Sequence, residues 1–172
     1  KKSKGIEISI KAIEKVHNSL DLNIIYDIYG PISQGYEKEF KKFIKKYDFV
    51  NYKGIVDMDK VSHTISKYDI FIFPTYWEDE GFPGVLIDAL IAGIPIIASD
   101  WAYNSEIIVD KENGFLVEPK DINDLTKKII KLIKNENLRK KMSLNNKNRA
   151  KNFDVRLIVE EFINILSDKE WF

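Results

Sequence analysis

The sequence contains no cysteine among its 172 residues, which excludes disulfide bonds and thiolate metal sites. Histidine is scarce too: His17 and His63 are far apart, so no histidine-based metal site is predicted. No apolar run approaches the roughly 20 residues that span a bilayer, and no signal peptide is recognisable. Excess charge is also lacking, because 27 Lys and Arg residues balance 27 Asp and Glu residues. This balance gives no reason to expect a nucleic-acid partner.

The remaining composition is typical of a globular protein, with 44% hydrophobic and 31% charged residues. A length of 172 residues suits a single domain, so we expect residues 1–172 to form one domain. The absence of cysteine fits a cytoplasmic protein. The first residue is lysine rather than methionine, so we expect the chain to be a piece of a longer protein.

Short apolar runs alternate with segments of helical periodicity, which predicts an α/β fold. The runs are rich in β-branched residues and lack polar alternation, as is typical of buried parallel strands. We therefore expect a Rossmann-like domain with a mostly parallel sheet and helices on both faces. The predicted strands are residues 23–29, 49–53, 69–73, 94–99 and 115–117. The predicted helices are residues 6–20, 34–46, 57–67 (with Asp57 as N-cap), 121–133, 135–150 and 154–166, and one that begins near Gly84.

The most informative stretch, E-G-F-P-G-V-L-I-D-A-L-I-A-G-I-P, runs from Glu80 to Pro95. It follows a predicted strand and contains a glycine-rich turn before a helix. Gly81 and Gly84 allow backbone N–H groups to approach a ligand closely. The helix that begins near Gly84 would direct its free N–H groups and the positive end of its dipole at the same place. This arrangement predicts a site for an anion, most plausibly a phosphate.

Two carboxylates accompany this turn. Asp88 lies four residues after Gly84 and so shares its helix face, where a carboxylate can accept hydrogen bonds from a pair of ribose hydroxyls. Glu80, on the loop, is placed to accept from hydroxyls attached beyond the phosphates. Its neighbours Glu78 and Asp79 compete for this role, and we prefer Glu80 because it directly precedes Gly81. The alternative is that Glu80 only caps the helix and Asp88 is solvated.

The stretch resembles the signature of retaining glycosyltransferases of the glycogen-synthase-like class, called family four or group 1, which have the two-domain GT-B fold. The matching positions are Glu80, Gly81, Phe82, Ala89, Gly93 and Pro95. The chain departs from the family pattern at Asp88, where the family has Glu, and at Pro83, where many members have Gly and a further N–H donor. The resemblance covers nearly the whole chain and implies the donor-binding, C-terminal half of such an enzyme.

The resemblance assigns a role to further residues. Lys4, with Gly5, matches a Lys-Gly pair that holds the diphosphate of the donor; the alternative is a solvated terminal lysine. Gly30 lies where the family approaches the phosphates, although it could simply form a turn. The remaining residues expected to bind the donor are Gly54, Ile55 and Val56, whose backbone would lie against the base, and Gly81, Phe82, Pro83, Gly84, Val85 and Asp88.

The resemblance implies that the whole enzyme transfers a sugar from a nucleotide-diphosphate sugar to an acceptor with retention. Lys4 and Glu80 are the expected catalytic residues, with no metal and no cofactor besides the donor substrate. The acceptor, a glycan or a lipid-linked molecule, would bind the missing N-terminal domain. Residues 151–172 would form a helix and tail that cross to that domain. The resemblance also implies bacterial polysaccharide or surface-glycan synthesis in the cytoplasm, with peripheral association at the inner membrane face.

Two alternatives remain open. One is a nucleotide-sugar epimerase on the same fold, whose catalytic groups would lie outside this chain. The other is a non-catalytic, nucleotide-binding partner subunit. The aspartate at position 88 and the bulky Trp101 near the expected pocket suggest this alternative.

Overall fold

The computed structural model describes residues 1–168, and five short strands form its centre. Strand β1 (Tyr26–Tyr29) pairs with β2 (Val50–Gly54). Strand β4 (Ile96–Ser99) lies between β3 (Phe71–Phe73) and β5 (Gly114–Val117). Every pair is parallel, so the predicted α/β class is confirmed. The strands are divided between two sheets, of two and three strands.

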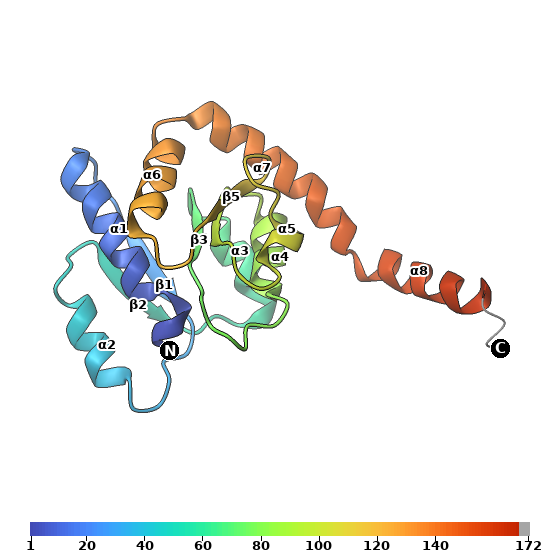
Figure 1. Ribbon diagram of the computed structural model, residues 1–172, viewed down its shortest axis with the longest axis horizontal. Helices are drawn as coiled ribbons and strands as arrows, with labels where there is room; N and C mark the ends of the chain where they lie inside the picture. The colour runs from blue at the N-terminus through green and yellow to red at the C-terminus, as the bar shows by residue number, and fades with distance from the viewer. Residues whose placement is uncertain (169–172) are drawn as a thin grey trace.

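Helices connect the strands and cover them on both faces (Figure 1). They are α1 (Ile6–Ser19), α2 (Glu37–Ile44), α3 (Val61–Ile65), α4 (Gly84–Ala92), α5 (Asn104–Ile107), α6 (Ile122–Ile133), α7 (Glu136–Ala150) and α8 (Val155–Asp168). Short 3-10 turns occupy Lys2–Lys4, Met58–Lys60 and Lys151–Phe153.

Strand β4 shows why the helices form two layers. Its side chains alternate between the faces of the sheet. Ile97 packs into the core beneath α1 and α6, whereas Ile96 and Ala98 pack into the core beneath α3, α4 and α5. All three side chains are fully buried, so the apolar run reads as continuous rather than alternating.

Several predicted elements differ from the structure: the strands over residues 69–73 and 94–99 begin at Phe71 and Ile96, and the helix over residues 34–46 spans Glu37–Ile44. Residues 23–25 do not belong to β1, which begins at Tyr26. The helix predicted over residues 57–67 is a 3-10 turn followed by the five-residue α3, and Asp57 makes no N-cap hydrogen bond. Its carboxylate accepts from Lys60 Nζ at 2.6 Å instead. The salt bridge satisfies the carboxylate that a cap would have used.

Helix α8 projects away from the rest of the molecule (Figure 1). Its apolar side chains are largely exposed, among them Leu157, Phe162 and Ile163. The structure thus shows the helix predicted within residues 151–172, and its docking to another domain stays a prediction. The predicted tail at residues 169–172 lies outside the described residues. None of the helices in residues 1–168 combines the length and apolar character needed to cross a lipid bilayer.

Candidate functional site

A cavity of about 670 Å³ lies against β1, β3 and the residues that follow β1, β2 and β3. Parallel strands place their carboxyl ends at one edge of a sheet, and ligands bind outside that edge. The predicted site residues that line this cavity are Lys4, Gly30, Ile55, Val56 and Val85. The structure therefore brings together residues separated by as much as 81 positions, since Lys4 and Val85 line the same space.

Lys4 and Glu80 form an ion pair at this cavity. The Lys4 Nζ atom lies 2.8 Å from Glu80 Oε1 and 2.7 Å from Oε2, so the ammonium group bridges both carboxylate oxygens. The Glu80 side chain is only 9% exposed, so removing Lys4 would leave a largely buried carboxylate without its cation. The Lys4 side chain, 35% exposed, is therefore paired with Glu80 rather than free in solvent.

Gly5 allows the main chain to bring Lys4 to this position. Its backbone is left-handed, with φ of 73°, and a Cβ at this residue would lie 1.9 Å from the carbonyl oxygen of Pro74. Ser3 also accepts a hydrogen bond from the Tyr76 N–H at 2.8 Å. Residues 3–5 consequently lie against the segment that follows β3, from which Glu80 also comes.

Thr75 holds the other side of the Glu80 carboxylate. Its fully buried side chain donates from Oγ1 to Glu80 Oε2 at 2.5 Å. The Thr75 carbonyl in turn accepts a hydrogen bond from Ser99 Oγ at the end of β4. Thr75 thus links the Glu80 carboxylate to the ends of β3 and β4.

Trp77 forms a wall beside the pair. The Nζ atoms of Lys1 and Lys4 lie 4.0 and 4.3 Å from its ring centroid. The Trp77 carbonyl accepts from Trp101 Nε1 at 2.8 Å, which fixes the loop. Trp101, expected to alter the pocket wall, therefore acts by holding Trp77. Positive charge gathers over this ring, which favours an anionic ligand.

Glu80 does not cap α4, so the capping alternative is wrong. The residue before α4 is Pro83, and no side chain caps the helix. Glu78 and Asp79 are exposed, and within residues 1–168 neither side chain takes part in a hydrogen bond or ion pair given by the structure. Of the three neighbouring acids, only Glu80 has the fixed geometry that a binding residue requires.

The N-terminus of α4 is open to a ligand. Its first turn contains no acidic side chain, and Gly81 and Gly84 have open space where a Cβ would stand. The Leu86 N–H donates to the Pro83 carbonyl at 2.9 Å, whereas the N–H groups of Gly84 and Val85 come before the first hydrogen bond of the helix. Pro83 is buried, while Phe82 is 51% exposed with its ring 6.4 Å from that of Tyr103. These residues border the loop of Glu80 rather than line the cavity.

Asp88 lies one turn inside α4 and is half-buried, so it is not the fully solvated carboxylate of the alternative. Burial raises its pKa above the usual value of 3.8. No hydrogen-bond partner of its carboxylate is found within residues 1–168. A carboxylate that is partly dehydrated and unpaired retains its capacity to accept from a ligand. Asp88 does not itself line the cavity.

Gly54 joins the ends of β1 and β2 rather than lining the cavity. Its carbonyl accepts from the Gly30 N–H at 2.8 Å, and both glycines have positive φ. The backbone here is in a conformation that other residues rarely adopt. Gly30, Ile55 and Val56 line the cavity, whereas Gly54 does not.

Sequence reasoning missed a polar cluster beside the cavity. Tyr68 donates from its hydroxyl to Asp27 Oδ2 at 2.7 Å, and its hydroxyl also lies 2.7 Å from that of Tyr29. Burial, reinforced by hydrogen bonds to Tyr29 and Asp27, raises the pKa of Tyr68 above its usual value. The side chains come from β1 and from the turn before β3, and no short motif in the sequence indicates that they meet.

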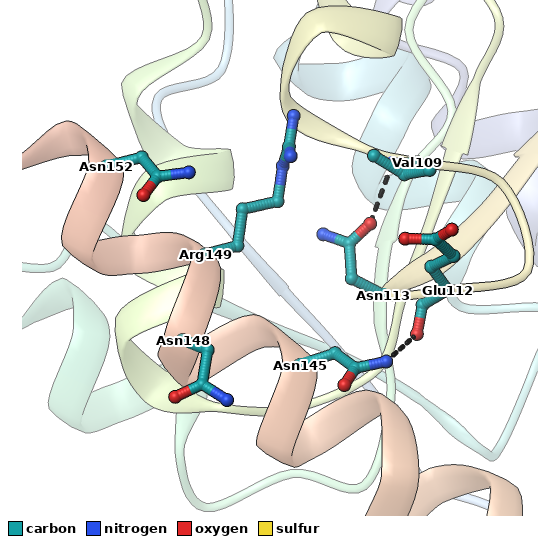
Figure 2. Close-up of a pocket in the computed structure, with 7 residues that line it drawn as sticks. All are labelled: Val109, Glu112, Asn113, Asn145, Asn148, Arg149 and Asn152. Carbon is teal, nitrogen blue, oxygen red and sulfur yellow. Dashed lines mark hydrogen bonds between the residues drawn. The ribbon is translucent and has the colours of Figure 1, made fainter.

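A second cavity, of about 290 Å³, lies between α7 and the turn before β5 (Figure 2). Its polar side chains bind main-chain groups: Arg149 donates to the carbonyl of Ile107, and Asn145 to that of Glu112 at 2.7 Å. None of the predicted site residues lines it. These contacts attach α7 to the turn, so we interpret this cavity as structural.

The site at the larger cavity combines the oriented Glu80 carboxylate, the Lys4 ammonium group and the N-terminus of α4, which has no capping side chain. A carboxylate orients hydroxyl groups, whereas an ammonium group and helix N–H groups bind anions. The arrangement suits a ligand that carries phosphate between two hydroxyl-bearing parts.

Comparisons with known proteins agree with this chemistry. Residues 1–149 match the sequence profile described as "Glycosyl transferases group 1". The chain is 32% identical over 167 residues to a glycosyltransferase of Methanocaldococcus jannaschii, covering 95% of this chain and 42% of that protein. It is 36% identical over 112 residues to the capsular polysaccharide biosynthesis glycosyltransferase CapM of Staphylococcus aureus, covering 63% of this chain and 29% of CapM.

A solved structure is also similar. The pneumococcal O-GlcNAc transferase GtfA, in complex with UDP and GlcNAc, superposes with a TM-score of 0.79 and 26% identity. The match covers 98% of this chain and 34% of the GtfA chain. The chain thus spans less than half the length of each of these relatives.

Proposed function

Because this chain belongs to the group 1 glycosyltransferase family, we propose that residues 1–172 bind the nucleotide-diphosphate sugar donor of a glycosyltransferase. The observation that carries the proposal is the Lys4–Glu80 pair, held by Thr75 at the cavity that Gly30, Ile55 and Val56 also line. GtfA was solved with UDP and GlcNAc, which makes UDP and its sugars the first ligands to test.

Lys4 and the N-terminus of α4 would bind the diphosphate. In the free protein, the Lys4 ammonium group is neutralised by Glu80. A bound diphosphate offers Lys4 a stronger anionic partner, and sugar hydroxyls can then donate to the released Glu80 carboxylate. The ion pair holds both side chains near their bound positions, which lowers the entropy lost on binding.

Glu80 and Asp88 would recognise the two hydroxyl-bearing parts of the donor. Thr75 keeps Glu80 oriented toward the sugar, while Asp88, one turn inside α4, would accept from the ribose. The main chain of Gly54, Ile55 and Val56 would lie against the base. Main-chain contact needs no particular side chain, so the base must be determined by experiment.

In the whole enzyme, the sugar would be transferred with retention at its anomeric carbon. As the glycosidic bond breaks, negative charge develops on the departing diphosphate. Lys4 and the free N–H groups of α4 would stabilise this charge without a metal or further cofactor. The acceptor would bind a domain outside residues 1–172, so we expect these residues alone to bind donor without transferring sugar. The capsular relative CapM supports a bacterial polysaccharide or surface glycan as the product.

Calorimetric titration of the full-length protein with UDP, GDP, ADP and their sugars tests the proposal. We expect one nucleotide and its sugars to bind. Glu80→Gln should weaken binding of the sugar nucleotide by roughly 10-fold or more, the cost of losing a charge-assisted hydrogen bond. Binding of the nucleotide without the sugar should change less, because Glu80 would contact the sugar.

Glu78→Gln is the matched control, because Glu78 is an exposed acid two residues from Glu80. Equal effects of the two substitutions, or no binding of any nucleotide, would contradict the proposed site. Transfer assays separate the remaining alternatives: an epimerase would convert the sugar nucleotide itself, and a non-catalytic subunit would bind it unchanged.

A further inference from the structure

Trp77 has a large aromatic ring that lies beside the ion pair and outside the hydrophobic cores. The side chain is half-buried and lines the larger cavity together with Lys4. Within residues 1–168, Trp77 belongs to neither of the two cores that pack on the faces of the sheets. Aromatic side chains that line a cavity instead of a core are typical of ligand sites.

The main chain of Trp77 is fixed by three hydrogen bonds. Its N–H donates to Thr75 Oγ1 at 3.3 Å. Its carbonyl oxygen accepts from the Glu80 N–H at 3.1 Å and from Trp101 Nε1 at 2.8 Å. Because all three bonds use main-chain atoms of Trp77, none of them requires the indole ring. The loop can therefore keep its conformation when the ring is replaced.

The ring of Trp77 and the carboxylate of Glu80 are held by shared groups. Thr75 Oγ1, which accepts from the Trp77 N–H, donates to Glu80 Oε2 at 2.5 Å. The Lys4 Nζ atom lies 2.7 Å from the same carboxylate oxygen and 4.3 Å from the centroid of the Trp77 ring. The ring and the carboxylate thus both contact one ammonium group.

An aromatic ring and a carboxylate in this arrangement have the chemistry of a sugar site. A pyranose carries hydroxyl groups around its edge and C–H groups on its faces. A carboxylate accepts hydrogen bonds from the hydroxyls. The negative face of an aromatic ring attracts the weakly positive C–H hydrogens, just as the Trp77 ring attracts the Lys4 ammonium group. Lys4 occupies the position between the two groups in the free protein.

We propose that Trp77 contacts the transferred sugar and helps to determine which sugar the site accepts. This role rests on the proposed function, in which Lys4 moves from Glu80 to the diphosphate. The same movement takes the ammonium group away from the Trp77 ring, which then packs against one face of a neutral pyranose. Glu80 binds hydroxyls at the edge of that pyranose. The diphosphate of the donor therefore opens the place that its sugar occupies.

A role limited to holding Lys4 has a different consequence. Lys4 would bind the diphosphate, so loss of the ring would then weaken every ligand that contains the diphosphate, with or without a sugar. Direct contact with the sugar affects only ligands that carry the sugar. A nucleotide diphosphate and its sugar nucleotide, compared in one variant, distinguish the two roles.

Calorimetric titration of full-length Trp77→Leu, first with UDP and then with UDP-N-acetylglucosamine, tests the proposal. We expect the sugar nucleotide to bind about 10-fold more weakly than to the wild type, and UDP to change by less than about threefold. Trp77→Phe keeps an aromatic face and should recover most of the lost affinity. Unchanged binding of UDP shows that the variant is folded.

Tyr76→Leu is the matched control. Tyr76 is the neighbouring aromatic residue and is also half-buried, and Lys120 Nζ lies 4.6 Å from the centroid of its ring. It does not line the cavity. This variant should bind both ligands as the wild type does.

Two results would overturn the proposal. One is unchanged affinity of Trp77→Leu for the sugar nucleotide. The other is an equal loss for UDP and the sugar nucleotide, which would limit Trp77 to holding Lys4. In both cases, binding of the sugar nucleotide to the wild type leaves the proposed function intact. A wild type that binds no nucleotide would instead refute the proposed function, and this role of Trp77 with it.

Discussion

The carboxylate of Glu80 accepts hydrogen bonds from two side chains that come from opposite directions. Lys4 approaches from the start of α1 and Thr75 from the end of β3. Buried and held on both sides, Glu80 has few accessible rotamers, so little entropy remains to be lost when a ligand replaces Lys4. The position of Lys4 depends in turn on the close contact between Gly5 and Pro74.

Gly5→Ala should therefore destabilise the protein strongly. A Cβ at this residue would clash with the Pro74 carbonyl and would also strain a left-handed backbone. We expect a loss of more than about 3 kcal/mol of unfolding free energy, measured by urea denaturation.

Gly35→Ala is the control for that experiment. Gly35 has a similar φ, 82°, but no atom lies within 4 Å of its Cβ position. The control should lose only about 1–2 kcal/mol, the cost of the left-handed backbone. Equal losses for the two variants would show that the contact between Gly5 and Pro74 is unimportant.

Asp88→Asn should raise stability at neutral pH and reduce ligand affinity. Burial raises the pKa of Asp88 in the folded protein above 3.8, so the ionised form is disfavoured by folding. The stability contributed by this group is full below pH 3.8 and is lost as the pH rises through the folded pKa. Asparagine cannot ionise and avoids this loss.

Thermal unfolding of both proteins between pH 3 and pH 7 provides the measurement. The variant should have the higher melting temperature at pH 7, and the difference should vanish below pH 3.8. Nucleotide affinity should fall about 10-fold, because the ribose loses a charged acceptor. A variant that is less stable at pH 7 would show that Asp88 has a stabilising partner.

At the scale of single elements, α4 has an uncapped N-terminus and open space beside Gly81 and Gly84. A helix end without a capping side chain is usually less stable than a capped one. Here the missing cap leaves the N–H groups available to an anion. The helix is otherwise secured by Leu86, Ala89 and Leu90, which are fully buried.

Gly84→Ala separates these two properties of α4. Alanine is the better helix former and has room for its methyl group, so stability should stay equal or increase. The methyl group would occupy the space that a phosphate needs, and nucleotide affinity should fall about 10-fold. Ile91→Ala, at an exposed position near the other end of α4, should leave affinity unchanged. Unchanged affinity in Gly84→Ala would remove α4 from the site.

Helix α7 is attached through a buried amide. Asn146 donates to the carbonyl of Ile94 at 2.7 Å and accepts from Asn113 at 2.9 Å. Asn146→Ala would leave the Ile94 carbonyl without this donor and Asn113 Nδ2 with only its 3.4 Å bond to the Ile107 carbonyl, and we expect a loss of about 2–4 kcal/mol in chemical denaturation. The neighbouring Asn145→Ala removes one exposed hydrogen bond and should cost less than about 1 kcal/mol. Similar costs would show that water satisfies the buried groups.

The elements themselves were largely predictable from the sequence. Buried strands such as β4 read as short β-branched runs, and the apolar stripe of α6 (Leu125, Ile129, Leu132) recurs at helical spacing. The predicted start of the helix over residues 121–133 is close to the observed one: Asp121 caps α6, and its side chain accepts from the N–H groups of Asn123 and Asp124. Residues close together in the sequence determine strands, helices and their caps, so these elements can be predicted from it.

Features that depend on residues far apart in the sequence were harder to predict. Asp57 was predicted as an N-cap, but its salt bridge to Lys60 replaces the cap. The pairing of Lys4 with Glu80 joins residues 76 positions apart, and only the family resemblance placed both at one site. The cluster of Asp27 and Tyr68 had no signal in sequence, because tertiary packing alone brings its members together.

At the scale of the whole molecule, the candidate site lies at the carboxyl edge of two parallel sheets, between the elements that follow β1 and β3. The apolar side of α8 is exposed in the described residues. The crossing of residues 151–172 to another domain remains a prediction.

A crystal structure of the full-length protein with its sugar nucleotide tests the central claim most directly. We predict that the Lys4 Nζ atom leaves Glu80 and lies about 3 Å from a diphosphate oxygen, while Glu80 accepts from a sugar hydroxyl. The first turn of α4 should face the same diphosphate. A nucleotide bound elsewhere, or bound here with the Lys4–Glu80 pair intact, would contradict the account.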